Sequence, residues 1–582
     1  MKRLILDKGK CNYHIVTGTM PHEAELYAAS QLSWYLYNAS KAFVPVFSSL
    51  ERCPKRSPEL CIGNNIRGIS VDTDCLSDDG FRIKTVGEDI VIAGKTPRGT
   101  LYGVYYFLEK YINFRCFTKD IETFDNIEKL EVEDLDIIEN PAFEYREVYF
   151  RSAFDADFCI KNGLNSNMAH IPKERGGKMK FFNFHHSFCD LVPPEKYFDE
   201  HPEYFSLVNG ERQREHTQLC LTNEDVYQIA LGTLRRWIKE NHDCKVFSVA
   251  QNDCFFYCTC PKCKELDDRY SSPAGSLITF INRLADDIKE DYPDVLIHTF
   301  AYQYSKKAPV GLTVADNVIV RLCNIECSWE KSMEKKAEEK PDSESAGFIK
   351  NISDWGKICK HLYIWDYACN FGNYLLPFPN YKSMPENLRT YRKNNLVGVM
   401  QQGNFSYGEA SGMADLESYL AARLLWNPDR DEDKIIDEFI LGVYGKKAHP
   451  YIREYIDLLL KSIEKNDLYI FHNTDSPIYS DELVEKAEKL FQSAIETADT
   501  EKQKWYLEKE YLSVMFMKAS RMPLEDPERE KLIDELYYQI KEFGITEIRE
   551  RKNIETSFEN LRKHRYFASE IASEYHLYYI MK

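Results

Sequence analysis

The segment Val246-Phe-Ser-Val-Ala-Gln-Asn-Asp253 predicts a buried strand, because it begins as a short apolar run and ends on polar residues and a carboxylate. The pattern recurs in Val318-Ile-Val-Arg-Leu-Cys-Asn-Ile-Glu326 and in Leu362-Tyr-Ile-Trp-Asp-Tyr367. Similar β-branched or apolar runs continue on both sides of these three. We predict strands at 144–151, 166–171, 180–184, 246–250, 295–300, 318–322, 362–365 and 397–401.

Helical stretches separate most of these predicted strands. Eight strands with intervening helices over roughly 290 residues is the arithmetic of a (β/α)8 TIM-type barrel, so we predict a barrel over residues 140–430. An open, doubly wound sheet is the alternative. The overall fold class is therefore predicted to be α/β.

Two further domains flank the predicted barrel. Residues 1–135 predict a small α/β domain, with helices over 22–40 and 98–111, a strand at 60–64 and a hairpin over 80–92. Residues 431–582 predict a helical domain, with helices over 450–465 and 480–498 and a third ending near Gly544. We expect Trp505 and Tyr511 to pack these helices together. The segment 331–345, acidic and rich in lysine, is expected to be a solvated loop or helix.

Composition limits the partners and the compartment. The chain of 582 residues has 93 acidic and 75 basic residues, a net charge of 75 − 93 = −18, which argues against a nucleic-acid binder. No run reaches 18 apolar residues, so no membrane span is expected. The first seven residues are too short an apolar run for a signal peptide. We expect a cytoplasmic protein, or a secreted or periplasmic one whose signal has been removed. The oligomeric state stays open.

Three carboxylates follow predicted strands, namely Asp253, Glu326 and Asp366. In a barrel the carboxyl ends of the strands form the active-site face. A protonated carboxyl that donates to a leaving oxygen, with an ionised one that activates water or acts as nucleophile, is what glycoside hydrolysis needs. The alternative is that these residues form structural salt bridges or helix N-caps.

Neutral polar and aromatic residues also lie at the ends of the predicted strands. They suit a polyhydroxylated ligand such as an oligosaccharide or glycoconjugate, although each aromatic could equally belong to the core. The adjacent His185 and His186 cannot both point into one cavity if their strand is regular. Our candidate substrate-binding residues are Arg151, His185, His186, Gln251, Asn252, Tyr302, Trp329, Trp365, Tyr367, Gln401, Gln402 and Asn404.

Cysteines cluster directly after Asp253. Four of the chain's 17 cysteines are Cys254, Cys258, Cys260 and Cys263, and this spacing could hold a structural zinc ion. A disulfide, reactive thiols or reduced packing cysteines are the alternatives. In each case the cluster would shape the loop after Asp253, and the chemistry expected above requires no cofactor.

Several of these motifs, in this order, resemble domain-of-unknown-function family 4838. They are His201-Pro-Glu-Tyr-Phe205, Asn209-Gly-Glu-Arg212, Val249-Ala-Gln-Asn-Asp253, Tyr257-Cys-Thr-Cys-Pro-Lys-Cys263, Asn324-Ile-Glu-Cys327 and Ile364-Trp-Asp-Tyr367. That family contains glycoside hydrolase family 163, endo-β-N-acetylglucosaminidases acting on complex N-glycans. The resemblance implies a glycosidase of β-linked N-acetylglucosamine-containing glycans, with Asp253 as general acid and Glu326 or Asp366 as its partner.

Segments on either side of the predicted barrel resemble parts of other glycosidases. Gly94-Lys-Thr-Pro-Arg-Gly-Thr-Leu-Tyr-Gly103 is similar to the non-catalytic domain that precedes the barrel in β-hexosaminidases and α-glucuronidases, and Gly442-Val-Tyr-Gly445 is similar to the α-glucuronidase layout. Asn252-Asp253 stands where hexosaminidases carry an Asp-Glu pair, so a carboxylate that orients a 2-acetamido group would have to be Glu326 or Asp366. The other hypotheses are an α-glucuronidase-like exo-glycosidase with Arg151 as uronate clamp, a non-catalytic carbohydrate-binding barrel and a zinc-dependent hydrolase.

Overall fold

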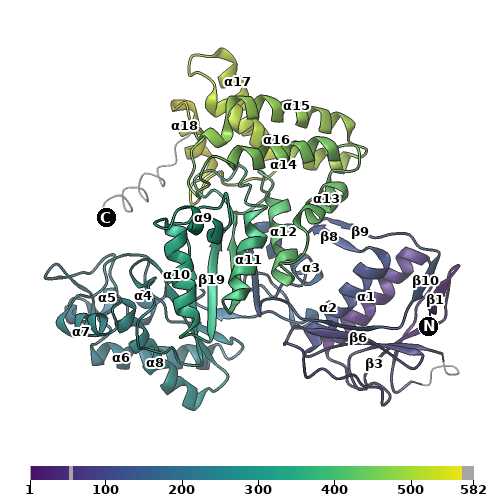
Figure 1. Ribbon diagram of the computed structural model, residues 1–582, viewed down its shortest axis with the longest axis horizontal. Helices are drawn as coiled ribbons and strands as arrows, with labels where there is room; N and C mark the ends of the chain where they lie inside the picture. Colours follow the sequence, from purple (N-terminus) through teal and green to yellow (C-terminus); the bar gives the residue numbers. More distant parts are fainter. Residues whose placement is uncertain (1, 52–56, 567–582) are drawn as a thin grey trace. The chain divides into compact units, whose positions relative to one another are not determined.

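A computed structural model describes residues 2–51 and 57–566 (Figure 1). The chain divides into two compact units. Unit 1 comprises Met1–Lys178, Ala368–Pro385 and Gln401–Lys582, and unit 2 comprises Met179–Tyr367 and Glu386–Met400. Within the described ranges, no helix is both long and apolar enough to cross a bilayer.

Parallel strands form the centre of unit 2. They belong to a seven-stranded sheet of order β12-β20-β19-β18-β17-β16-β13, which curls into a half-barrel. Its register pairs Val246 with Leu296, and Ile297 with Val318, so neighbouring strands run in the same direction. β18 is buried along its whole length, including Arg321, which interrupts its apolar run. The strands of unit 2 are β13 (Phe181–Phe182), β16 (Val246–Ser248), β17 (Leu296–Ala301), β18 (Val318–Cys323), β19 (His361–Tyr367) and most of β20 (Leu396–Gln402), whereas β12 (Tyr145–Tyr149) and Gln401–Gln402 belong to unit 1.

The mixed α/β class is confirmed, and seven of the eight predicted strands overlap these seven. The prediction of a strand at 166–171 was wrong, because this segment is irregular. Its backbone N–H groups bond to a side chain instead of a neighbouring strand: Asn167 N donates to Glu147 Oε2 at 2.6 Å, and Met168 N donates to the same oxygen at 3.4 Å. The buried Glu147 therefore takes the donors that a strand ladder would use.

Helices cover the sheet of unit 2. α8 packs against β17 and β18, and α6 packs against α8. The Asn223 side chain caps α6 by accepting from the N–H groups of Asp225 and Val226. The segment 331–345 holds α9 and the start of α10, and most of its charged side chains are exposed or half-buried. The elements are α4 (Phe188–Leu191), α5 (Pro194–Tyr197), β14 (Leu207–Val208), β15 (Glu211–Arg212), α6 (Glu224–Glu240), α7 (Pro261–Arg269), α8 (Ala274–Asp291), α9 (Met333–Glu339), α10 (Glu344–Gly356) and α11 (Ser383–Lys393), with 3-10 turns at Pro202–Tyr204 and Gln303–Ser305.

The N-terminal part of unit 1 has the predicted elements. Its main sheet has the order β11-β6-β7-β5-β3-β4, and α1 and α2 lie side by side against it (Figure 1). The predicted hairpin is the antiparallel pair β6 and β7. The elements are β1 (Arg3–Asp7), β2 (Lys10–Cys11), β3 (His14–Thr17), α1 (Glu23–Ser40), β4 (Val46–Ser48), β5 (Glu59–Ile62), β6 (Phe81–Val86), β7 (Asp89–Gly94), α2 (Pro97–Ile112), β8 (Arg115–Thr118), β9 (Ile121–Thr123), β10 (Lys129–Val132) and β11 (Asp136–Glu139).

The rest of unit 1 is mainly helical, and the three predicted helices are present as α14, α15 and α17. Ser480 caps α15 by accepting from Leu483 N. Trp505 packs on Phe543 at 5.2 Å between ring centroids, and Tyr511 on Phe491 at 6.1 Å. The elements are α3 (Ala156–Lys161), α12 (Ala414–Trp426), α13 (Glu432–Val443), α14 (His449–Ile463), α15 (Asp481–Thr497), α16 (Glu501–Arg521), α17 (Pro527–Glu542) and α18 (Ile554–Lys563), with 3-10 turns at Arg151–Phe154, Lys173–Arg175 and Pro477–Tyr479.

A buried carboxylate joins the N-terminal sheet of unit 1 to β12. Asp79, 3% exposed, accepts from Arg98 Nε at 2.6 Å and from Arg146 Nη2 at 2.6 Å. Burial alone would raise the pKa of Asp79, but the two guanidinium groups outweigh it and the pKa is lowered. The carboxylate is therefore charged and is shared by two guanidinium groups.

We expect Asp79→Asn to lower the free energy of unfolding by about 3–5 kcal/mol, because it leaves buried guanidinium charge uncompensated. Urea unfolding followed by circular dichroism measures this loss. The neighbouring Asp78 is exposed, so Asp78→Asn is the matched control. Equal unfolding midpoints for the two variants would contradict this account of the Asp79 cluster.

Candidate active site

Three carboxylates lie at one edge of the sheet of unit 2. Asp253 follows β16, Glu326 follows β18, and Asp366 lies near the end of β19. Because these strands are parallel, their carboxyl ends meet at the same edge. Burial raises the pKa of the Cys323 thiol at the end of β18; the charge of Arg321 lowers it, and the charges of Glu326 and Asp253 raise it.

Asp366 is a buried carboxylate surrounded by donors. It is 2% exposed. Its Oδ1 accepts from Asn324 Nδ2 at 2.7 Å and from Trp329 Nε1 at 3.3 Å, and its Oδ2 accepts from the hydroxyl of Tyr391 at 3.1 Å. Burial raises the pKa of Asp366, and these hydrogen bonds oppose the shift without cancelling it. The arrangement ties the ends of β18 and β19 to α11.

Glu326 differs from Asp366, because it has a cationic partner. Its side chain is 11% exposed, and Lys306 Nζ lies 3.4 Å from Oε1. The same ammonium lies 3.1 Å from the exposed Glu344. Burial raises the pKa of Glu326, while Lys306 lowers it and Glu344 raises it; the net shift is upward. This carboxyl is therefore suited to hold a proton at the edge of the sheet.

Asp253 is exposed to solvent, and its Oδ1 accepts from Gln303 Nε2 at 3.1 Å. Gln303 opens the 3-10 turn after β17 with a φ of 52°, a left-handed conformation that non-glycine residues seldom adopt. Its Oε1 is buried and has no hydrogen-bond partner within the described ranges. The strained turn thus aims an amide at Asp253.

The two residues before Asp253 hold the loop in place. Gln251 is buried, donates from Nε2 to Tyr302 O at 3.0 Å and accepts from the hydroxyl of Ser305. Asn252 donates from Nδ2 to Thr217 O at 2.7 Å. Both predicted substrate-binding amides are therefore used within the protein.

The two histidines after β13 differ in their surroundings. His185 is exposed. His186 Nδ1 lies 2.5 Å from Gln251 O, and the ring packs against Phe300 at 5.2 Å between centroids. Of these two histidines, His185 is therefore the more exposed to solvent.

The predicted aromatic residues are largely buried. Trp329 is 1% exposed, and Tyr302 and Tyr367 are also buried. Trp365 is half-buried, with its centroid 5.7 Å from that of Phe300 and 5.8 Å from the guanidinium of Arg321. Among the four aromatic residues predicted to bind substrate, Trp365 therefore offers the most ring surface to a sugar.

Arg151 and the three polar residues at the end of β20 belong to unit 1. Gln401, Gln402 and Asn404 are buried. Arg151 lines a cavity of about 820 Å³, and its guanidinium stacks on Tyr407 at 4.3 Å from the ring centroid. No described carboxylate forms an ion pair with Arg151. The cavity is large enough for a sugar and offers a cation. Its other residues include Lys119, Tyr149, Phe154, Asp155, His170, Phe405, Glu409 and Asp415.

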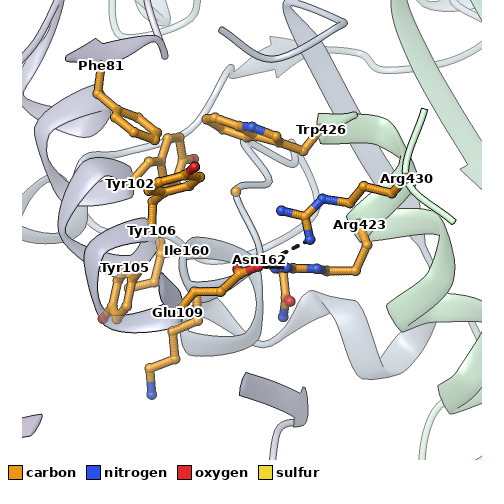
Figure 2. A pocket seen from close by; sticks show the side chains of 12 residues that line it. Phe81, Tyr102, Tyr105, Tyr106, Glu109, Ile160, Asn162, Arg423, Trp426 and Arg430 are labelled. Carbon is orange, nitrogen blue, oxygen red and sulfur yellow. Dashed lines mark hydrogen bonds and ion pairs between the residues drawn. The ribbon is translucent and has the colours of Figure 1, made fainter. Parts of the chain in front are cut away.

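A second pocket in unit 1 is too small for a sugar. Its volume is about 40 Å³, and its polar wall is an ion cluster in which Arg423 and Arg430 point to Glu109 (Figure 2). Burial would raise the pKa of Glu109, but the arginines lower it to about 2. The carboxylate is neutralised within the protein, so this pocket is structural.

The cysteine cluster differs from the predicted set in one member. Cys220, Cys258, Cys260 and Cys263 gather their sulfur atoms within 4.8 Å of one another, and all four are buried. Cys254 lies outside this group; its Sγ accepts from Gln218 Nε2 at 3.3 Å, and burial raises its pKa to about 11. The prediction that Cys254 joins the group was therefore wrong.

Sequence reasoning missed Gln303, Lys306 and Tyr391. Gln303 and Lys306 follow the predicted strand at 295–300, so an inspection of that strand's end would have found them. No sequence signal marks Tyr391, because it approaches Asp366 from the interior of α11.

The chain matches one protein family and is similar in fold to known glycoside hydrolases. The model of the family described as "Domain of unknown function (DUF4838)" matches residues 116–457, more than half of the chain. A family 115 glycoside hydrolase, a 4-O-methyl-α-glucuronidase with specificity for decorated arabinogalactans, is similar in structure with a TM-score of 0.57 and 10% identity, covering 93% of this chain and 77% of that one. A family 89 glycoside hydrolase from Clostridium perfringens gives a TM-score of 0.51 and 14% identity, covering 79% and 61%. No curated protein matches in sequence. At these identities the likeness is one of fold.

We expect Asp366→Asn to lower the free energy of unfolding by about 1–3 kcal/mol, because an amide presents a donor where the carboxylate accepts from several groups. Asp253→Asn is the matched control: this side chain is exposed, so its stability should change by no more than about 0.5 kcal/mol. Thermal unfolding of both variants measures the difference. A larger loss for Asp253→Asn would contradict the assignment of Asp366 as the structural carboxylate.

Proposed function

The chain belongs to the DUF4838 family, and we propose that it is a glycosidase that cleaves β-linked N-acetylglucosamine-containing glycans. The observation that carries the proposal is the pair Glu326 and Asp253, a mostly buried carboxyl with a raised pKa and an exposed carboxylate at one sheet edge. Glycoside hydrolysis needs one carboxyl that keeps its proton and one that stays charged. The fold shared with known glycoside hydrolases supports the reaction class. The structure from Clostridium perfringens is a complex with a 2-acetamido sugar analogue, which fits the substrate class.

In this proposal Glu326 is the general acid. Its proton passes to the glycosidic oxygen as the bond from that oxygen to the anomeric carbon breaks. A water molecule attacks the anomeric carbon and gives its proton to Asp253, or Asp253 orients the 2-acetamido group that attacks first. The roles are the reverse of those expected from the family resemblance, because burial raises the pKa of Glu326 and so favours the proton on this carboxyl.

We propose that the scaffold is a TIM-type barrel, with 166–171 occupying the second-strand position in irregular form. The expected division into an N-terminal α/β domain, a barrel over residues 140–430 and a C-terminal helical domain belongs to the same proposal. The order of parallel strands and helices in unit 2 supports it.

A second candidate is an α-glucuronidase-like exo-glycosidase. The specific observation is Arg151, a guanidinium in a sugar-sized cavity with no ion-pair partner in the described part of the chain. A uronate carboxylate would fit such a cation. Turnover of aryl glucuronides that is lost in Arg151→Gln, with no turnover of N-acetylglucosaminides, would favour this candidate over the first. Glycan binding without turnover of any substrate would indicate a carbohydrate-binding protein instead.

Replacing Glu326 by Gln should lower kcat/KM on N-glycans by about 10²- to 10⁴-fold, because the proton donor is lost. Asp253→Asn should cause a loss of similar order. Glu344→Gln is the matched control, since Glu344 binds the same lysine but is 62% exposed; it should retain activity within a few-fold. Chromatography measures the rate of sugar release by each variant. Full activity in Glu326→Gln would remove Glu326 from the mechanism.

The pH dependence of kcat/KM should report the raised pKa of Glu326. A general acid is active when protonated, so kcat/KM should fall as pH rises through this pKa, and the fall should lie above the range of an ordinary glutamate. Lys306 lowers the pKa of Glu326, so Lys306→Gln should move the fall to higher pH, whereas Glu344→Gln should move it to lower pH. Shifts in the opposite directions would show that another group controls the profile.

A further inference from the structure

Four cysteines from separate segments of unit 2 meet at one point. Cys220 precedes α6, Cys258 and Cys260 lie in the loop after β16, and Cys263 lies in the first turn of α7. Their exposed fractions are between 1% and 7%. Their sulfur atoms lie within 4.8 Å of one another, and no histidine or carboxylate belongs to this group.

The spacing of the sulfur atoms fits a tetrahedral metal ion. Zinc binds thiolate sulfur at about 2.3 Å, which places two sulfurs of a tetrahedron about 3.8 Å apart. Cys220 Sγ lies 3.7 Å from Cys260 Sγ. A disulfide would need about 2.05 Å. The distance is compatible with two ligands on one ion and too long for a disulfide.

Donors surround the sulfur atoms from outside the group. Leu207 N donates to Cys258 Sγ at 3.4 Å, and Arg212 Nη1 lies 3.8 Å from the same sulfur. The hydroxyl of Thr222 lies 3.2 Å from Cys263 Sγ. Four thiolates on a divalent ion carry two net negative charges, and backbone N–H groups and a guanidinium are what stabilises them. Ordinary thiol packing needs no such donors.

We propose that Cys220, Cys258, Cys260 and Cys263 bind one structural Zn²⁺ ion. Four thiolates fill a tetrahedral site, so the ion has no open position for catalysis. It would fasten the loop that begins after Asp253 to Cys220 and to α7, with the β14–β15 hairpin supplying donors through Leu207 and Arg212. The metal site stands independently of the proposed glycosidase activity, and Asp253 is only positioned by it.

The first test is the metal content of the purified full-length protein by mass spectrometry. We expect one zinc per chain, released in step with the modification of four thiols by a mercurial reagent. The protein prepared with Co²⁺ should show the thiolate-to-cobalt charge-transfer absorption of a tetrahedral four-sulfur site. Zinc at well below one equivalent, iron in its place, or a cobalt spectrum without thiolate bands would overturn the proposal.

The second test compares two of the proposed ligands with Cys254, a cysteine outside the group. Cys220→Ser and Cys263→Ser should each lower the bound zinc at least several-fold and lower the thermal midpoint, whereas Cys254→Ser should keep zinc at one equivalent. If a ligand variant does not fold, the thiol titration of the wild-type protein still decides. Zinc content, unlike activity, does not depend on the proposed reaction, so failure of the metal site and failure of the glycosidase assignment are distinguishable. Equal zinc in Cys220→Ser and Cys254→Ser would exclude Cys220 as a ligand.

Discussion

The hydrogen bonds to the buried carboxylate of Asp366 constrain the sheet edge on which the candidate site is built. A carboxylate at 2% exposure is costly unless donors surround it. Asn324 and Trp329 come from the segment after β18, and Tyr391 comes from α11, so satisfying Asp366 fixes three segments at once. Glu326 lies between Asn324 and Trp329 in sequence, and its position follows from theirs.

Glu326 shows how the same edge can hold a proton. Burial and the neighbouring Glu344 favour the neutral form, and Lys306 limits that preference. Two charged neighbours therefore adjust the pKa of Glu326 in opposite directions: the half-exposed Lys306 and the exposed Glu344. Both can be changed by mutation without altering the strands of the sheet. At Asp366, by contrast, several hydrogen-bond donors hold the side chain in place. Two carboxyls with similar burial therefore serve different purposes because their partners differ.

The sequence predicted much of this architecture for a physical reason. Apolar runs such as Val246–Ser248 and Val318–Cys323 are buried on both faces, and parallel strands bring their polar ends to one edge. The predicted strand at 166–171 is absent because backbone amides of this segment bond to the Glu147 side chain. Hydrophobic periodicity in the sequence does not reveal a tertiary interaction of this kind. Cys220 was missed because it lies forty residues from Cys260 in sequence. The sequence also could not separate Asp366 from Glu326, since both follow apolar strands and only their donors distinguish them.

The role of Glu326 as proton donor is tested by comparing substrates with different leaving groups. A general acid is needed for a poor leaving group and is dispensable for an activated one, such as a dinitrophenyl glycoside. With Glu326 as proton donor, Glu326→Gln should lose about 10²- to 10⁴-fold in rate on N-glycans and only a few-fold on the activated glycoside. An equal loss on both substrates, or on neither, would contradict the assignment of Glu326 as the acid.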